Sequence, residues 1–125
     1  MLLTREQIQA STVAVETVSV PEWGGEVLVA DMGGDARDAF ERWCLDHSGA
    51  GFVGARATLA SFAIVGADGE RLFTPEDVGW LGKKSAAALD RVYAVASRLN
   101  RLTKKDVAEL EKNSGGETSG ASTSA

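Results

Sequence analysis

The sequence predicts an α+β fold, in which a mostly helical single domain carries an N-terminal β-hairpin and a disordered C-terminal tail. Three observations predict it. β-Branched and alternating residues flank the segment PEWGG, over residues 13–20 and 26–32, which is typical of two strands joined by a turn. Apolar residues recur at three- and four-residue steps in the segments that follow, as in amphipathic helices. The final residues are mostly Gly, Ser and Thr.

Length and composition narrow the possibilities further. The 125 residues, 44% of them hydrophobic, suffice for one core, so we expect one domain at residues 1–112 and a tail at residues 113–125. A net charge of −5 disfavours nucleic acid as a partner. The longest strongly apolar run, residues 62–65, is far shorter than the ~20 residues of a membrane-spanning helix, so no membrane is expected. The single cysteine and the lack of a secretion signal fit a reducing cytoplasm.

The first expected element is a short helix that ends at about Ala10. Thr4 and Gln7 have the spacing of a capping box, in which each residue satisfies a backbone N–H of the other. Leu3 is placed to pack on Ile8 across the start of this helix.

The turn of the hairpin is expected at residues 21–25. Pro21 cannot donate to a sheet ladder, and Gly24 and Gly25 permit the positive φ of a tight connection. Two strands alone are marginally stable, so the hairpin must pack on helices or on another subunit. Trp23 at its tip would gain most from such burial, and packing in the core is the alternative role for it.

Two helices are expected in the middle of the chain. Asp35 can cap the first, which runs to about His47 and has an apolar stripe made of Ala36, Ala39, Phe40, Trp43 and His47. A glycine-containing break at residues 48–51 separates it from a second helix at about residues 53–65. Asp68 and Gly69 then mark a turn, which a short extended segment follows.

Three capped helices are expected in the last third. Thr74 caps a short helix that has Pro75 at its first position and stops at Gly82. Ser85 opens the longest helix, which should form the spine of the core through Leu89, Val92, Ala96 and Leu99.

The third of these helices begins at Thr103 and ends near Asn113. Val107 and Leu110 give it a narrow apolar stripe. Beyond it, no side chain is apolar and large enough to offset the entropy of ordering, so the tail is expected to be disordered.

One motif associated with a cofactor occurs out of context. Gly49, Gly51 and Gly54 spell G-x-G-x-x-G, the fingerprint of dinucleotide-binding folds. That fingerprint requires a preceding buried strand and a parallel sheet, whereas a helix precedes it here. The glycines are better interpreted as a loop between helices, and no cofactor is expected.

Two clusters of polar residues have structural interpretations. Cys44 and His47 could both reach one metal ion, but zinc requires three or four protein ligands and no second cluster supplies them. Asp31, Asp35 and Asp38 could perform acid–base chemistry if burial separated their pKa values. Helix capping and a solvated surface are the simpler roles for them.

The order of whole segments resembles that of the tail assembly chaperones of long-tailed, siphovirus-type bacteriophages. The segments are VSVPEWGGEVLVADM, GADGERLFTPEDVGWLGKKSAAALDRVYAVASRLN and LTKKDVAELEKN, and the likeness covers about residues 2–113. The resemblance implies a protein of the host cytoplasm that is absent from the mature virion. Such a protein binds the tape-measure protein, keeps it soluble, recruits tail-tube subunits, and self-associates into oligomers. The resemblance implies no catalytic residues.

The resemblance also suggests a second, longer product made by a −1 ribosomal slip. Residues 111–113, Glu-Lys-Asn, can be encoded as GAA AAA AAC, which contains the slip-prone heptamer A AAA AAC in the required frame. We therefore hypothesise that a slip occurs there, which would leave residues 114–125 in the short product only.

The expected function is protein binding, and four residues are candidate contacts: Trp23, Trp80, Val107 and Leu110. Each could instead belong to the core, because single apolar residues at a surface are ordinary. Two other functions remain open. The chain could be a structural minor tail or connector protein that stays in the virion, or a small enzyme or regulatory protein that uses the acidic cluster at residues 31–38.

Overall fold

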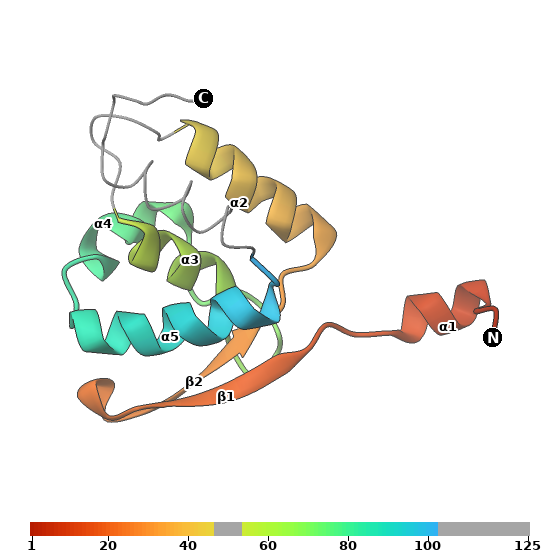
Figure 1. Ribbon diagram of the computed structural model, residues 1–125, viewed down its shortest axis with the longest axis horizontal. Helices are drawn as coiled ribbons and strands as arrows, with labels where there is room; N and C mark the ends of the chain where they lie inside the picture. The colour runs from red at the N-terminus through yellow and green to blue at the C-terminus, as the bar shows by residue number, and fades with distance from the viewer. Residues whose placement is uncertain (47–53, 103–125) are drawn as a thin grey trace.

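The computed structural model describes residues 1–46 and 54–102, and it confirms the α+β fold (Figure 1). A three-stranded antiparallel sheet, in the order β1-β2-β3, forms one layer and helices form the other. The elements in chain order are α1 (Arg5–Ala10), β1 (Val15–Val20), the 3-10 turn η1 (Pro21–Trp23), β2 (Gly25–Ala30), α2 (Gly34–Asp46), α3 (Ala55–Ala63), β3 (Ile64–Val65), the 3-10 turn η2 (Pro75–Asp77), α4 (Val78–Leu81) and α5 (Ala86–Leu99).

The chain opens with an arm, residues 1–14, that contains α1 and points away from the rest of the molecule (Figure 1). The predicted capping box is present, with Gln7 N–H donating to Thr4 Oγ1 at 3.2 Å and Thr4 N–H donating to Gln7 Oε1 at 2.9 Å. Leu3 and Ile8, which were expected to pack on each other, are each 59% exposed, so neither side chain is buried. Every residue of the arm is exposed.

The hairpin forms as predicted, with Val15 opposite Ala30 and Val20 opposite Gly25. The turn η1 begins at Pro21 and closes at Gly24, whose φ of 79° lies in the left-handed region and whose N–H donates to the Pro21 carbonyl. Gly25 already belongs to β2 and its φ is not positive. One glycine, and not both, therefore provides the unusual backbone conformation.

The third strand corrects the sequence prediction, which placed residues 64 and 65 at the end of a helix. The helix α3 ends at Ala63, and Ile64 and Val65 pair with Val29 and Leu28 of β2. Both side chains are buried, and β-branched residues such as these fit a strand that is covered on both sides. Val65 also forms a bridge with Arg71, so the segment after the Asp68-Gly69 turn is extended, as expected.

The start of α2 also differs from the prediction. This helix begins at Gly34, and the Gly33 carbonyl accepts the N–H of Arg37 at 2.8 Å. Asp35 is therefore in the first turn of the helix and is not the capping residue. Its negative charge there interacts favourably with the helix dipole. On the expected apolar stripe Phe40 is buried, whereas Ala39 is exposed.

The helices α3 and α5 form the centre of the core. All residues of α3 except Arg56 are buried. Ser85 caps α5 by accepting the N–H of Ala88. Of the predicted spine, Leu89, Val92 and Ala96 are buried, and Leu99 is partly buried and packs against the core. The helix α5 contacts α3 on one side and both strands of the hairpin on the other. The hairpin thus packs on a helix of its own chain.

Several predictions fall on residues 47–53 and 103–125, which lie outside the described part of the chain. They include His47, most of the G-x-G-x-x-G segment, the helix expected at residues 103–113, the candidate contacts Val107 and Leu110, and the tail. Within the described ranges, no helix has the length and apolar character needed to cross a membrane.

Candidate binding surfaces

Trp80, on the short helix α4, is a partly exposed aromatic side chain with several contacts to its neighbours. The residue is 47% exposed, yet three neighbours contact its indole. The indole N–H donates to Asp77 Oδ1 at 2.9 Å. The Phe73 ring meets it edge to face, with the ring centroids 5.8 Å apart, and Lys84 Nζ lies 5.7 Å from its centroid. We call this surface of Phe73, Asp77, Trp80 and Lys84 the aromatic corner.

Asp77 joins the aromatic corner to the backbone of the preceding turn. Its Oδ2 accepts the Thr74 N–H at 2.8 Å, as in a capping box, while its Oδ1 holds Trp80. These hydrogen bonds, from the Thr74 backbone first and from Trp80 second, lower the pKa of Asp77. The carboxylate is therefore ionised, and both oxygens are available as acceptors, throughout the neutral range.

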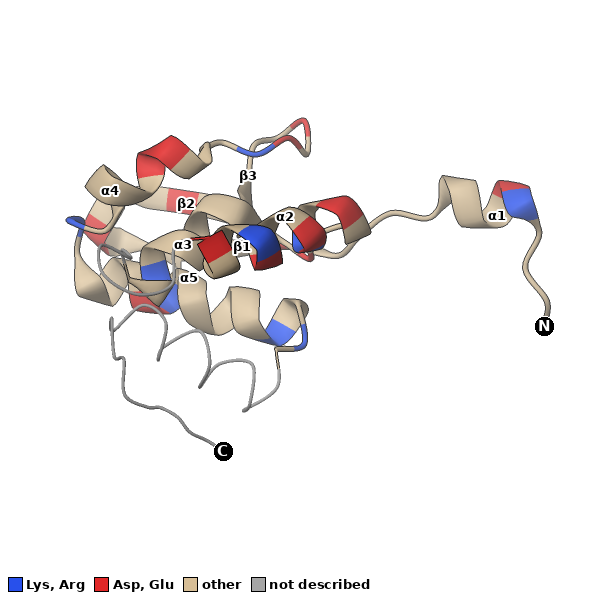
Figure 2. Ribbon diagram, turned by 90° about the horizontal axis from the view of Figure 1, so that it is seen from above, with Lys and Arg blue, Asp and Glu red and all other residues tan. Residues whose placement is uncertain are grey.

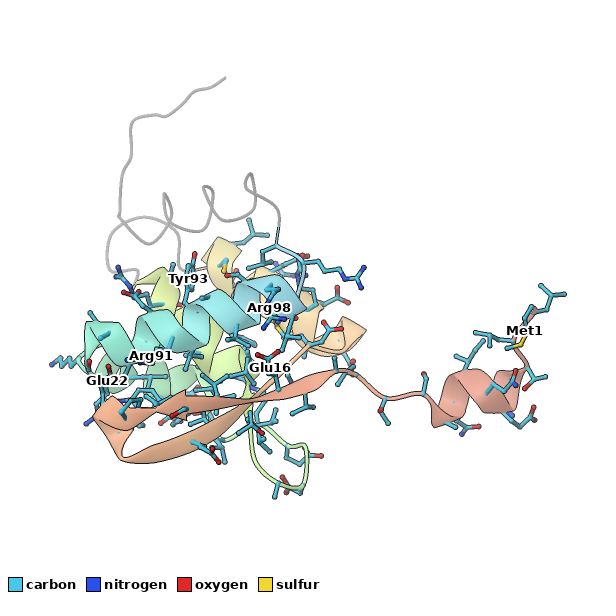
Figure 3. The ribbon with its side chains drawn as sticks, turned by 60° about the horizontal axis from the view of Figure 1, so that its bottom comes forward. Met1, Glu16, Glu22, Arg91, Tyr93 and Arg98 are labelled. Carbon is cyan, nitrogen blue, oxygen red and sulfur yellow. The ribbon has the colours of Figure 1, made fainter. Side chains whose placement is uncertain are left out.

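The structure places Trp23 differently from Trp80. Trp23 ends η1 at the tip of the hairpin, is half-buried, and packs against the core cluster. Beside it, Glu22 forms two bonds with Arg91 of α5, at 2.9 and 3.1 Å, and these bonds hold the hairpin tip against the helix layer (Figure 3). Trp23 remains a candidate contact, but a partner could reach only part of it.

The acidic cluster is spread over two elements. Asp31 follows β2 and its N–H continues the ladder to the Ala14 carbonyl, whereas Asp35 and Asp38 are exposed on α2. Cys44 is half-buried on the same helix, and desolvation first, then the charge of Glu41, raises the pKa of its thiol to about 11. Among residues 1–46 and 54–102, no group of three His, Cys, Asp or Glu side chains is placed to hold a metal ion.

A second surface, the outer face of the sheet, was missed by the sequence analysis. The register and the alternation of strands place seven side chains on the face opposite to Val18, Val20 and Val29, which pack into the core. We call them the outer sheet face: Val15, Thr17, Ser19, Glu26, Leu28, Ala30 and Val65. The helices lie on the other side of the sheet (Figure 1). On this face Val15 is 49% exposed and Leu28 is partly exposed, whereas Ala30 and Val65 are buried.

The arm was predicted as a helix, but its exposure was not. Its apolar residues Leu2, Leu3, Ile8 and Val13 are all exposed, and Figure 2 shows α1 as far from the rest of the described chain as Figure 1 does. Exposure of this kind depends on how the rest of the chain folds, so the sequence of the arm alone does not reveal it.

Comparisons with known proteins add one finding. No protein-family model matches the sequence, and no curated protein matches it. A solved structure described as that of the bacteriophage HK97 tail assembly chaperone matches with 18% sequence identity, over 75% of this chain and 90% of that one, at a TM-score of 0.49. A similarity of this size is one of general outline, and it does not say what this chain binds.

Proposed function

We propose that this chain is a tail assembly chaperone of a long-tailed bacteriophage, which binds the tape-measure protein, keeps it soluble, and recruits tail-tube subunits. The resemblance of the sequence segments suggests these partners. The aromatic corner is the observation from the structure that supports protein binding as the activity. A protein with this role acts in the host cytoplasm and is absent from the mature virion.

The physical argument depends on how Trp80 is held. An exposed indole that is free to rotate would lose conformational entropy when a partner ordered it. Here the bond to Asp77 and the contact with Phe73 already fix the ring, so much of that cost is met before binding. Tryptophan is also among the residues that contribute most to binding energy at interfaces. A long helical protein with an apolar stripe could lay that stripe against the corner, as amphipathic helices do in grooves.

The decisive test measures binding of the cognate tape-measure protein to the full chain and to the variant Trp80→Ala. We expect the variant to lose about 2 kcal/mol of binding free energy, which is about thirtyfold in Kd. The variant should also lose about 1 kcal/mol of stability, because it lacks the bond to Asp77 and the ring contact with Phe73, but it should stay folded. Calorimetry or a fluorescence titration gives the Kd, and urea unfolding gives the stability.

The matched control is Leu45→Ala, which truncates another exposed apolar residue, on α2. It should leave the Kd within about twofold of the wild-type value if the aromatic corner is the contact. Equal affinity of Trp80→Ala and the wild type would exclude the corner as the binding surface.

Two further observations would decide between the proposal and a structural role in the virion. Purified phage particles should lack this chain, because its presence there would instead identify a minor tail or connector protein. Expression from the natural coding DNA should yield, by mass spectrometry, a longer product whose peptides cross from residues near Glu111 into the −1 frame.

A further inference from the structure

The two edges of the sheet differ in what lies beside them. At the β3 edge, Val65 forms a bridge with Arg71, just past the turn that follows this strand. The Leu72 N–H also donates to the Ile64 carbonyl there, at 3.2 Å. The strand β1, at the other edge, is six residues long and pairs on one side only, with β2 (Figure 1). The longer edge is therefore the open one.

The hydrogen-bond pattern identifies the backbone groups of β1 that are unpaired. The Asp31 N–H donates to the Ala14 carbonyl at 2.8 Å, so these two residues form a hydrogen-bonded pair of the ladder. In an antiparallel ladder, every second residue directs its N–H and C=O groups away from the partner strand. In β1 these residues are Val15, Thr17 and Ser19. Their three N–H and three C=O groups bond nothing within residues 1–46 and 54–102.

The strand β1 lacks the usual protection of an edge. Proteins commonly block an edge strand with proline, with charged side chains or with a bulge. The strand β1 contains neither Pro nor Lys, and its register with β2 runs through all six pairs without a bulge. Its one charged side chain, Glu16, is bound by Arg98 at 2.8 Å (Figure 3). The three residues that face away from β2 are all exposed, so a partner can reach them.

We propose that the free edge of β1 binds an extended segment of another protein, which adds to the sheet as a further strand. Unpaired N–H and C=O groups at every second residue match the edge of a strand, which carries the same groups at the same spacing. A helix cannot take this place, because its backbone groups bond one another. The proposal does not depend on the aromatic corner, which belongs to other elements of the chain.

Charge and neighbouring side chains define the chemistry of this segment. The side chains of an added strand alternate, so one set lies beside Glu16 and Val18, on the side of α5, and the other lies beside Thr17 and Ser19. Glu16 and the net charge of −5 disfavour an acidic segment. Thr pairs favourably with Thr or Ser across strands. The fitting segment is therefore neutral or basic, with apolar residues toward α5 and Thr or Ser on the outer face.

Amide hydrogen exchange of the full chain tests the proposal, with the blocked peptide Lys-Thr-Val-Thr-Val-Thr-Val-Lys as the probe. In the free chain, the N–H groups of Val15, Thr17 and Ser19 should exchange fast, and those of Glu16 and Val18 slowly. Saturating peptide should slow the first set at least about tenfold and change the second set far less. Slowing that does not alternate along β1 would overturn the proposal.

The same measurement without peptide tests whether a second copy of this chain occupies the edge. Exchange is recorded over a range of protein concentrations. We expect the unpaired N–H groups of β1 to exchange fast at each of them. Alternating protection that increases with protein concentration would identify a second copy as the occupant and would overturn the proposal.

A pair of variants at one position separates the backbone from the side chain. Thr17→Pro removes an N–H that bonds nothing within the described residues, so it breaks no bond of the ladder, whereas Thr17→Val keeps that N–H. We expect Thr17→Pro to bind the labelled peptide at least about tenfold more weakly than the wild type, and Thr17→Val to bind within about twofold. Fluorescence anisotropy measures both. Equal binding by Thr17→Pro and the wild type would contradict the proposal.

Modified peptides repeat this test with the wild-type chain, so the result does not depend on how well Thr17→Pro folds. One peptide carries N-methyl groups on its Val residues and the other on its Thr residues. Because an added strand donates one alternate set of its N–H groups, one peptide should bind at least about tenfold more weakly than the other. Equal binding of the two would show that the backbone is not recognised, which would overturn the proposal.

A peptide with Glu in place of both Lys residues tests the charge of the segment. It should bind at least about threefold more weakly than the probe at low salt, and tighter binding would overturn the assignment of a neutral or basic segment. None of these measurements involves the tape-measure protein or Trp80, so failure here is distinguishable from failure of the proposed function.

Discussion

Asn100 is a buried residue whose side chain joins two elements that are far apart in the sequence. Its side-chain oxygen accepts the Met32 N–H at 2.7 Å, and its nitrogen donates to the carbonyls of Ala30 and Ala96 at 3.3 and 2.9 Å. The side chain is buried, so none of these backbone groups could turn to water without rearrangement. Asn100 thus fixes the end of β2 to the end of α5.

Replacing this residue should destabilise the fold. Asn100→Ala leaves buried backbone groups of Met32 and Ala30 without partners, and we expect a loss of about 2 kcal/mol in the free energy of unfolding by urea. Asn100→Asp keeps the acceptor for the Met32 N–H, but it places a carboxylate oxygen against the carbonyls of Ala30 and Ala96, which repel it. We therefore expect a similar loss of stability. The exposed substitution Ser19→Ala should change stability by less than about 0.5 kcal/mol. A stable Asn100→Ala variant would show that these bonds contribute little.

The next two residues complete the end of α5. Arg101 has a φ of 54°, and the N–H groups of Arg101 and Leu102 bond the carbonyls of Arg98 and Ser97, which is the Schellman arrangement. Glycine is the usual residue at the left-handed position. Here an arginine occupies it, and the packing of Leu102 on the core accompanies that strained backbone.

At the scale of the element, the hairpin turn offers a test with a close control. Neither Gly24 nor Gly25 has an atom within 4 Å of the position where a Cβ would lie, but only Gly24 has a positive φ. Gly24→Ala should therefore lower the free energy of unfolding by about 1 kcal/mol, whereas Gly25→Ala should change it by a few tenths at most. Thermal or urea unfolding measures both. Equal effects of the two would place the strain elsewhere in the turn.

The sequence predicted those elements whose signals are local. The capping residues Thr4, Thr74 and Ser85 each bond a backbone group within three residues, and such spacing is visible in the sequence. The strand β3 is different, because Ile64 and Val65 continue a helical pattern and only pairing with β2 makes them a strand. The Asp35 prediction was wrong because α2 begins two residues earlier than a cap at Asp35 implies, at Gly34, in a glycine pair that has no side chains to signal a helix start.

The same distinction applies to the candidate surfaces. Trp80 was a candidate from the sequence, and its bond to Asp77 spans three residues, so that part could be predicted. The edge contact with Phe73 depends on how the η2–α4 turn folds. The outer sheet face depends on strand register, and on which side the helices cover, and periodicity alone reveals neither.

At the scale of the whole molecule, two ion pairs join the sheet to the helix layer. Glu16 of β1 pairs with Arg98, and Glu22 of η1 pairs with Arg91, both on α5 (Figure 3). The bond to Arg91 lowers the pKa of Glu22 below its ordinary value of 4.5. A carboxyl group whose pKa is lower in the folded state stabilises the fold above its unfolded pKa, and this contribution is lost as the pH falls through the folded value.

Acid should therefore weaken the ion pair between Glu22 and Arg91, which joins the hairpin to the helix layer. At neutral pH the variant Arg91→Gln should be less stable than the wild type, and the difference should shrink as the pH falls below about 4.5. Urea unfolding at several pH values measures this difference. Arg42→Gln, on the exposed side of α2, is the control and should show no such convergence. A gap between Arg91→Gln and wild type that stays constant from pH 7 to about pH 3 would contradict this role for Glu22.

The bonds that Asn100 makes have a consequence for the order of events during synthesis. Met32 and Asn100 are 68 residues apart, and Glu16 and Arg98 are 82 apart, so the contacts that hold the hairpin to its cover connect early residues to much later ones. A ribosome releases the hairpin long before it releases α5. Until α5 emerges, the inward valines of the hairpin stay exposed on the nascent chain, because a hairpin alone has no core to bury them in. The nascent chain thus exposes an apolar surface that is prone to aggregation until α5 has been synthesised.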